Sequence, residues 1–162
     1  MIRAATPADD AAIAAIWNDV IAQPHITFTT TPKTPADIAA LRAAGPVLVT
    51  EDATGFACAG PFRGGPGYAD VAELSVHLAP AARGQGQGRA LVTALEAALP
   101  QVAVIVAAIS GANPDAVQFH MALGYLHVGT MPAIGDKGGR RFDLILMQKF
   151  LPAHPDFGRP QR

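Results

Sequence analysis

The chain has a single cysteine, almost no net charge and no long unbroken apolar run. Its 12 Lys and Arg residues oppose 13 Asp and Glu residues, so the formal net charge is −1. That balance gives no electrostatic support for nucleic-acid binding. With Cys58 alone, an intramolecular disulfide is excluded. Because no apolar stretch could span a bilayer and no signal-peptide pattern opens the chain, we expect a cytoplasmic protein without a membrane partner.

Apolar residues are abundant, at 50% of the chain against 15% charged. This composition suits a buried sheet flanked by helices, and 162 residues suffice for a sizeable core. We find no internal repeat or linker, so we expect one domain over residues 1–162, with a core at about 2–150 and a loose Pro-rich tail at 152–162. Cys58 lies in an apolar strand-like run and is interpreted as a small core residue.

Helix start and stop signals divide the chain into alternating elements. Thr6-Pro7, Thr34-Pro35 and Asn113-Pro114 are typical helix starts, whereas Gly45 and Gly124 are typical helix ends. Runs of apolar residues predict strands at about 2–5, 46–50, 56–60, 71–78, 102–107, 125–128 and 142–149, and a fourth helix at 89–99. The order β-α-α-β-β-β-α-β-α-β-β predicts an α/β fold with a mixed sheet of about seven strands and about four helices.

The most informative segment is the run Arg83-Gly84-Gln85-Gly86-Gln87-Gly88, between an expected strand and an expected helix. Such a strand-turn-helix presents unpaired backbone N–H groups to an anion, and glycine allows a phosphate to approach closely. A Walker-type P-loop is excluded because no Gly-Lys-Ser/Thr follows the glycines. A Rossmann site is disfavoured because the glycines follow the fourth strand rather than the first. The acyl-CoA pattern Arg/Gln-x-x-Gly-x-Gly/Ala remains.

With this pattern and element order, the chain resembles the GNAT superfamily of acyl-CoA N-acyltransferases. Further segments make it similar to the phosphinothricin N-acetyltransferase-like family, and together they cover about residues 2–149. These segments are Thr27-Phe28-Thr29-Thr30-Thr31-Pro32; Gly60-Pro61-Phe62-Arg63 through Tyr68 to Val76; and Asn113, 119–125, 128–129 and 135–140. His77, Ala116 and Phe142 depart from the family's usual residues, which bears on the substrate more than on the chemistry.

The resemblance implies the GNAT fold and an acetyl-CoA-dependent N-acetyltransferase that works by direct transfer in a ternary complex. The implied acceptor is the amino group of a small amino acid or analogue, of the phosphinothricin, methionine sulfone or methionine sulfoximine type. It also implies a homodimer, in which a loop from Met131 to Arg141 and the region of Tyr68 complete a neighbour's pocket. No metal cofactor is predicted.

Two residues are candidates for the chemistry, which requires deprotonating the ammonium and protonating the leaving thiolate. Strand alternation places Glu73 on one face with Ser75 and His77. The pattern alone leaves open whether this strand is central or a solvated edge, and the resemblance implies that Glu73 is the catalytic base. The resemblance also implies a role for His120, as the acid or as a substrate ligand. A structural or solvated histidine is the alternative.

Other predicted site residues come from the resemblance. Backbone groups of Val76, His77 and Leu78 are expected to bind the pantetheine arm like an added strand, and Asn113 to face it while capping a helix. The turn Gly84, Gln85, Gly86, Gln87 and Gly88 is expected to hold the pyrophosphate. Arg83 or Arg89 would neutralise it, unless they are solvated helix-end charges. The residues predicted to bind the acceptor are Phe28, Arg63, Tyr68, Glu73, Ser75, Lys137 and Arg140, of which Arg63, Lys137 and Arg140 compete as its anionic-group anchor.

The sequence is also compatible with two other functions. One is a CoA-binding sensor or a decayed paralogue without efficient transfer, against which Glu73 and His120 argue, because a pure binder needs neither. The other is acetylation of a different amine, on a protein, an antibiotic or a polyamine.

Overall fold

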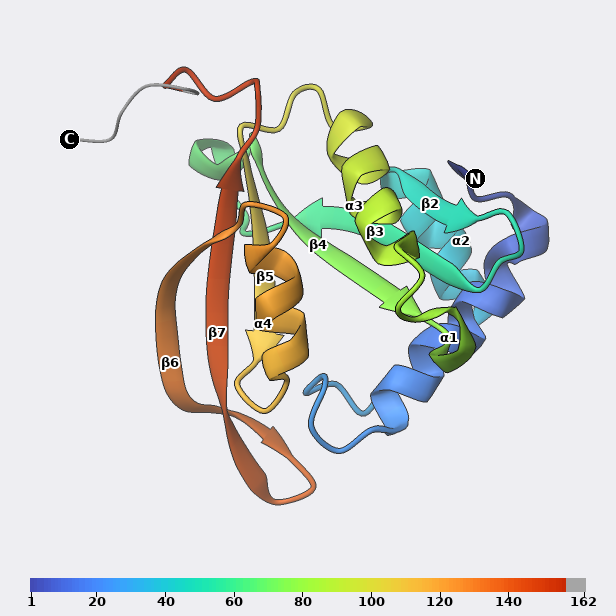
Figure 1. Cartoon of the computed structure of the whole chain (residues 1–162), viewed down its shortest axis with the longest axis horizontal. Coiled ribbons are helices and arrows are strands. Elements are labelled where there is room, and N and C mark those ends of the chain that lie inside the picture. Colours follow the sequence, from blue (N-terminus) through green and yellow to red (C-terminus); the bar gives the residue numbers. More distant parts are fainter. Residues whose placement is uncertain (157–162) are drawn as a thin grey trace.

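A computed structural model describes residues 1–156 as one seven-stranded sheet with four α-helices (Figure 1). Only β4 and β5 pair in parallel; the other neighbouring strands are antiparallel. The mixed α/β sheet predicted from the sequence is therefore confirmed. In spatial order the strands are β1 (Ile2–Ala4), β2 (Val47–Thr50), β3 (Gly55–Pro61), β4 (Val71–Leu78), β5 (Val104–Ser110), β7 (Arg140–Phe150) and β6 (Leu126–Lys137).

The helices are α1 (Asp10–Ala22), α2 (Pro35–Ala44), α3 (Gln87–Ala97) and α4 (Pro114–Met121). Two of the four helices, α2 and α4, begin directly after the capping residues that the sequence marks, whereas α3 begins two residues before its expected start at residue 89. The Thr34 hydroxyl accepts from the Asp37 N–H at 3.3 Å while Asp37 accepts from the Thr34 N–H at 2.7 Å, which is a reciprocal cap. Thr6-Pro7 opens a short 3₁₀ turn (Pro7–Asp9) that leads into α1.

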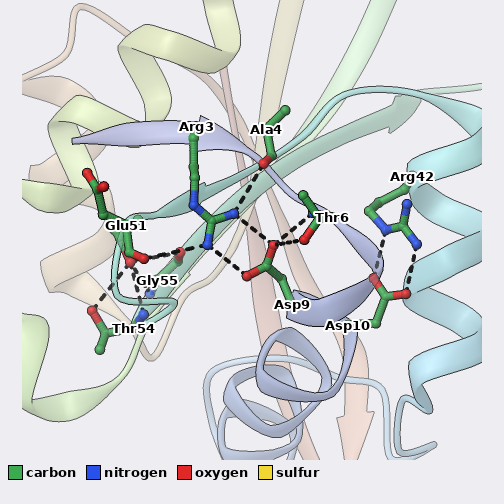
Figure 2. A network of polar contacts seen from close by, with 10 residues as sticks. Arg3, Ala4, Thr6, Asp9, Asp10, Arg42, Glu51, Thr54 and Gly55 are labelled. Atoms are coloured by element: carbon green, nitrogen blue, oxygen red, sulfur yellow. Dashed lines mark hydrogen bonds and ion pairs between the residues drawn. The ribbon is translucent and has the colours of Figure 1, made fainter.

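A polar network ties the N-terminal elements together (Figure 2). Asp9 accepts two hydrogen bonds from the Arg3 guanidinium, at 2.8 and 2.9 Å, and one from the Thr6 N–H at 2.8 Å. Asp10 accepts two from Arg42 of α2, at 2.7 and 2.8 Å. Each buried aspartate therefore has a guanidinium partner, which connects β1, α1 and α2.

Two hydrophobic clusters cover the two faces of the sheet. One joins α3 to the central strands and includes Leu74, Leu91, Leu95 and Ile105. The other joins α1 and α2 to β2 and β3 and includes Cys58, whose burial raises the pKa of its thiol to about 11. Cys58 is a core residue, as its apolar surroundings in the sequence predict.

The two central strands separate halfway along their length. β4 and β5 pair only from Val71–Glu73 to Val104–Val106. Beyond Glu73, β4 continues on β3 as far as Leu78, whereas β5 continues on β7 as far as Ser110. Figure 1 shows the two strands diverging. The separation leaves one edge of β4 without a strand partner in the middle of the sheet.

The segment 131–141 differs from the loop expected there. β6 extends to Lys137 and β7 begins at Arg140, so only Gly138 and Gly139 form the turn. Pro132, Gly129 and Gly135 interrupt the strand pattern in the sequence, but register shifts between His127 and Gly129 and between Met131 and Gly135 accommodate them. After β7, residues 152–156 form turns and His154 packs on Phe150; the rest of the predicted loose tail lies outside the described residues.

Candidate functional site

Two hollows meet at the point where β4 and β5 separate. The first, which we call the larger cleft, has a volume of about 640 Å³ and lies between the segment 26–29, Phe62, Arg63, the end of β5 and the middle of β6 and β7. The second, which we call the strand groove, measures about 280 Å³ and lies between residues 74–77 of β4, residues 107–109 of β5 and α4. Glu73 lines both, together with Ile26, Thr27, Thr29 and Ala108.

Glu73 is half-buried at this junction and has no polar partner in the part of the chain that the structure describes. Its neighbours Ala72 and Leu74 point into the core beneath α3, so Glu73 faces the opposite side of the sheet. β4 lies between β3 and β5, which excludes the edge-strand alternative. Within residues 1–156 the carboxylate forms no hydrogen bond or ion pair, and burial raises its pKa. A carboxylate of raised pKa next to an open cleft is suited to accept a proton.

His120 on α4 presents a free nitrogen to the strand groove. Its Nδ1 lies 2.8 Å from the carbonyl oxygen of Ala116, which can only accept, so Nδ1 carries the proton. Nε2 is buried and lacks a partner among the described residues. The rings of Phe119 and Tyr125 pack edge-on against the imidazole, at 5.0 and 5.1 Å. Burial lowers the pKa of His120, so the ring is neutral and Nε2 is an acceptor.

The free edge of β4 provides the wall of the strand groove. Ser75, Val76 and His77 line it, and Leu78 lies at its end with its side chain in the core. The His77 ring packs on Trp17 and Phe56, at 5.7 and 5.5 Å, and burial lowers its pKa to about 4. Asn113 accepts from the Ala116 N–H at 3.3 Å and also lines the groove, so it can both cap α4 and contact a ligand.

The glycine turn adopts the conformation that its composition predicts. Gly84 and Gly86 have φ of +74° and +78°, and open space surrounds both. No side chain caps the first turn of α3, which leaves N–H groups for an anion. The side chain of Gln85 instead bonds the Ala81 carbonyl, and that of Gln87 lies against Thr54.

Gly88 serves helix packing, and its expected part in the pyrophosphate turn stays a prediction. A Cβ at Gly88 would lie 3.2 Å from the Phe119 ring, so its lack of a side chain allows α3 to pack closely on α4. Arg83 and Arg89 are both exposed at the turn. Arg83 donates to the Leu78 carbonyl at 3.4 Å and Arg89 to the Ala122 carbonyl at 3.3 Å, and either remains available as a counter-charge.

The larger cleft brings together some of the predicted acceptor residues. Phe28 and Arg63 line it, and the ring of Phe28 stacks on that of Phe142 at 5.9 Å. Arg63 forms no ion pair within residues 1–156 and lies over the ring of Tyr68 at 5.9 Å. Tyr68 therefore supports Arg63 from outside the cleft, while Ser75 belongs to the strand groove.

Lys137 and Arg140 lie elsewhere, in contrast to their predicted role as acceptor anchors. The Lys137 ammonium is buried and donates to the backbone carbonyls of Ile21 and Gln23, each at 2.6 Å. Arg140 is exposed and lies over the Phe142 ring at 5.3 Å. Neither residue lines the larger cleft or the strand groove. The cause is the length of β6 and β7, whose hairpin carries both residues away from Glu73.

Sequence reasoning missed Thr27, Thr29 and Lys33. The two threonines line both hollows, and Lys33 lines the strand groove with its Nζ 5.1 Å from the Trp17 ring. The motif that contains Thr27 and Thr29 indicates this segment, but nothing in it distinguishes the two threonines from Phe28 as site residues. Nothing in the sequence distinguishes Lys33 from a solvated loop lysine.

The described part of the chain shows neither a metal cluster nor a spanning helix. In residues 1–156, no group of three His, Cys, Asp or Glu residues is placed to bind a metal ion. No helix in that same range is both long and apolar enough to cross a membrane.

Within residues 1–156, the structure combines divided central strands, a glycine turn at a helix start and an unpaired carboxylate where the two strands separate. The chain belongs to the acetyltransferase (GNAT) family, whose family profile matches residues 13–125. It is therefore an acetyltransferase that uses acetyl-CoA, and the family predicted from the sequence is confirmed.

Two sequence relatives and one solved structure show which members of the family this chain resembles. A methionine sulfoximine/methionine sulfone acetyltransferase of Pseudomonas paraeruginosa is 37% identical over 91% of this chain and 92% of its own length. The phosphinothricin N-acetyltransferase of Streptomyces viridochromogenes is 35% identical over 98% of this chain and 93% of its own length. A phosphinothricin acetyltransferase of Sinorhizobium meliloti, solved in complex with acetyl-CoA, superimposes with a TM-score of 0.86 at 30% identity, covering 100% of this chain and 93% of that one.

Proposed function

We propose that this enzyme transfers the acetyl group of acetyl-CoA to the amino group of a small amino acid or analogue bound in the larger cleft. The observation that carries the proposal is the unpartnered carboxylate of Glu73, at the junction of the larger cleft and the strand groove. An acceptor on one side and an acetyl donor on the other would meet at this carboxylate. The names of the relatives support an acceptor of the methionine sulfoximine, methionine sulfone or phosphinothricin type.

The residues present fit acetyl-CoA. The free edge of β4 offers N–H and C=O groups to an extended amide chain, as an added strand would use them. The open space at Gly84 and Gly86 and the uncapped N-terminus of α3 suit a pyrophosphate, with Arg83 or Arg89 nearby. When bound there, acetyl-CoA supplies a thioester carbonyl as the electrophile.

In this proposal Glu73 removes one proton from the acceptor ammonium, directly or through a water. The nitrogen lone pair then forms the new C–N bond as the C–S bond breaks. The nitrogen gives up its second proton, and the leaving thiolate takes up one proton in exchange through water. Because His120 is neutral and its Nε2 carries a lone pair, it serves as a hydrogen-bond acceptor for a ligand N–H rather than as the acid.

Arg63 is the proposed anchor for the acidic group of the acceptor. It is the one lysine or arginine that lines the larger cleft within the described residues. A guanidinium can pair with a carboxylate or a phosphinate through two parallel hydrogen bonds. Phe28 would form the apolar wall beside the acceptor side chain.

Thiol release from acetyl-CoA tests this function directly, with mass spectrometry of the acceptor product. The panel contains methionine sulfone, methionine sulfoximine, phosphinothricin, unmodified methionine, spermidine and an aminoglycoside. We expect N-acetylation of the first three compounds to exceed that of the polyamine and the aminoglycoside. Tight CoA binding without thiol release on any amine would favour the sensor or decayed paralogue, and preference for spermidine or the aminoglycoside would contradict the acceptor class.

We further propose a cytoplasmic homodimer in which β6 contributes to the interface. β6 is an edge strand, and Leu126, Val128, Met131 and Ile134 on it expose large apolar side chains. Met131 also lines the larger cleft, so a second copy at this edge would border the acceptor. Sedimentation at micromolar concentration should give about twice the 16.7 kDa chain mass. A monomer at that concentration would contradict the dimer.

A further inference from the structure

The segment of residues 23–34, which we call the cleft loop, supplies side chains to both hollows. Ile26, Thr27 and Thr29 line both of them and Phe28 lines the larger cleft. No helix or strand spans the segment between α1 and α2, so its shape depends on tertiary contacts. The contacts that hold it therefore determine the shape of the acceptor site.

We propose that Lys137 and Gly135 of β6 are positioning residues for acceptor binding, because they clamp the cleft loop against the β6–β7 hairpin. This inference rests on the proposed function, which places the acceptor in the larger cleft. Neither residue touches the hollows; both would act through the loop.

The first half of the clamp is the Lys137 ammonium. It reaches from the tip of the hairpin to the point where α1 ends, and it donates to the carbonyls of Ile21 and Gln23 at 2.6 Å each. Ile21 is in the last turn of α1, where carbonyls lack helical partners, and Gln23 is the first residue of the cleft loop. Lys137 thus fixes the direction in which the loop leaves the helix.

The second half is the fit between Gly135 and Phe28. A methyl group at Gly135 would overlap the ring of Phe28, so only glycine permits this close approach. Gly135 is the cross-strand partner of Phe142 on β7, and the ring of Phe142 stacks on that of Phe28 with an interplanar angle of 19°. Phe28 therefore packs across both β6 and β7 at this pair, and its position in the cleft wall follows from theirs.

The far end of the cleft loop is fixed independently. The side chain of Asn18 on α1 accepts from the Lys33 N–H at 2.7 Å and donates to the Lys33 carbonyl at 2.9 Å. Because Lys33 is held on α1, the position of residues 26–29 depends on the contacts of the cleft loop with Lys137 and Gly135 of β6.

The environment of Lys137 supports a role beyond solvation of a helix end. Its ammonium forms no ion pair within residues 1–156, and burial lowers its pKa. Burying an ammonium without a carboxylate is costly, whereas an exposed lysine could cap a helix at little cost.

The first test compares Lys137→Met with Arg42→Met. Lys137→Met keeps the apolar part of the side chain and removes the hydrogen-bond donors at the C-terminal end of α1. Arg42→Met removes the partner of Asp10 at the N-terminal end of the same helix. We expect Lys137→Met to raise the KM of the acceptor by about tenfold and to leave the KM of acetyl-CoA within about twofold. Arg42→Met should lower Tm without changing either KM. If Lys137→Met lowers Tm and leaves the acceptor KM unchanged, Lys137 is only structural and the proposal fails.

The second test compares two glycines of the same strand. Gly135→Ala should displace Phe28 and raise the acceptor KM by about tenfold, whereas Gly129→Ala should not, because a Cβ there meets nothing within 4 Å. Combining Gly135→Ala with Phe28→Ala removes the overlap, so the two changes should be less than additive. Full additivity would overturn the contact as the cause.

A third measurement separates this inference from the proposed function, since it needs no substrate. Chymotrypsin cleavage after Phe28 of the free protein should be on the order of tenfold faster in Lys137→Met and Gly135→Ala than in wild type or Gly129→Ala. If the wild type acetylates nothing while cleavage follows this pattern, the clamp is supported and the proposed function fails. Equal cleavage in all four proteins overturns the clamp, whatever the activity.

Discussion

The N-terminal network and the junction of β4 and β5 both contain polar groups that are at least partly removed from water. In the network these groups are paired with one another, whereas at the junction they are not. Asp9 accepts from Arg3 and Thr6, and these hydrogen bonds lower the pKa of its carboxyl well below the usual range (Figure 2). Glu73 has no such partner, and burial raises its pKa. The nearby His120 keeps one nitrogen unpaired as well. Charges in the first region stabilise the fold, whereas those in the second are available to a ligand.

The largest expected effect concerns Glu73. Glu73→Gln keeps the shape of the side chain and removes the base, so we expect kcat to fall by about 10²–10⁴-fold. In the wild type, kcat/KM should fall as the pH drops through the raised pKa of Glu73, and the variant should lose this dependence. Steady-state assays over the pH range measure both. A change in KM alone would make Glu73 a binding residue.

The next effect concerns Arg63, which is the one lysine or arginine lining the larger cleft among residues 1–156. A charge-assisted hydrogen bond contributes about 1.5–3 kcal/mol, so Arg63→Ala should raise the acceptor KM by roughly 10–100-fold. The KM of acetyl-CoA should stay nearly unchanged. The opposite pattern would place Arg63 on the CoA phosphates.

A smaller effect is expected at Gly86, with Gly139 as the matched control. Both have strongly positive φ, +78° and +77°, and open space around them, so alanine strains both turns alike, by about 1–2 kcal/mol. Only Gly86→Ala should lower the affinity for CoA, by about tenfold, because only Gly86 precedes α3. Calorimetry measures both affinities. Equal CoA affinities in the two variants would show that the glycine turn does not bind CoA.

The smallest effect lies in the paired region. Asp9→Asn removes the negative charge that accepts hydrogen bonds from Arg3 and Thr6. We expect the free energy of unfolding to fall by about 1–2 kcal/mol, after allowing for the partial exposure of Arg3. Thermal unfolding should show a Tm lower by roughly 2–8 °C. Because the pKa of Asp9 is lowered, this contribution is present at neutral pH and disappears as the pH falls through its folded-state value. Acetylation below Tm should not change; a loss comparable to that of Glu73→Gln would contradict the division of roles.

Local signals in the sequence predicted the fold well. Capping pairs such as Thr34-Pro35 act within a few residues, and the alternation that puts Glu73 opposite Leu74 depends only on strand geometry. The glycine turn was visible because positive φ requires glycine.

What the sequence could not predict depends on distant contacts. Lys137 meets Ile21 across more than a hundred residues, so it was indistinguishable from a cation facing the acceptor. The close packing of Gly88 on Phe119 joins α3 to α4, which no local pattern in the sequence indicates. The β6–β7 hairpin was missed because its irregularities resemble a loop.

The most direct test of the division between paired and unpaired charges is the Tm of Glu73→Gln relative to wild type as a function of pH. A carboxyl whose pKa is raised in the folded state contributes its stability below the unfolded-state pKa and loses it as the pH rises through the folded-state value. Near pH 3.5 the two proteins should therefore unfold at the same temperature. At pH 8 the inactive variant should be as stable as the wild type or more so. A lower Tm for Glu73→Gln at pH 8 would mean that Glu73 has a stabilising partner, and it would contradict a carboxylate held free for chemistry.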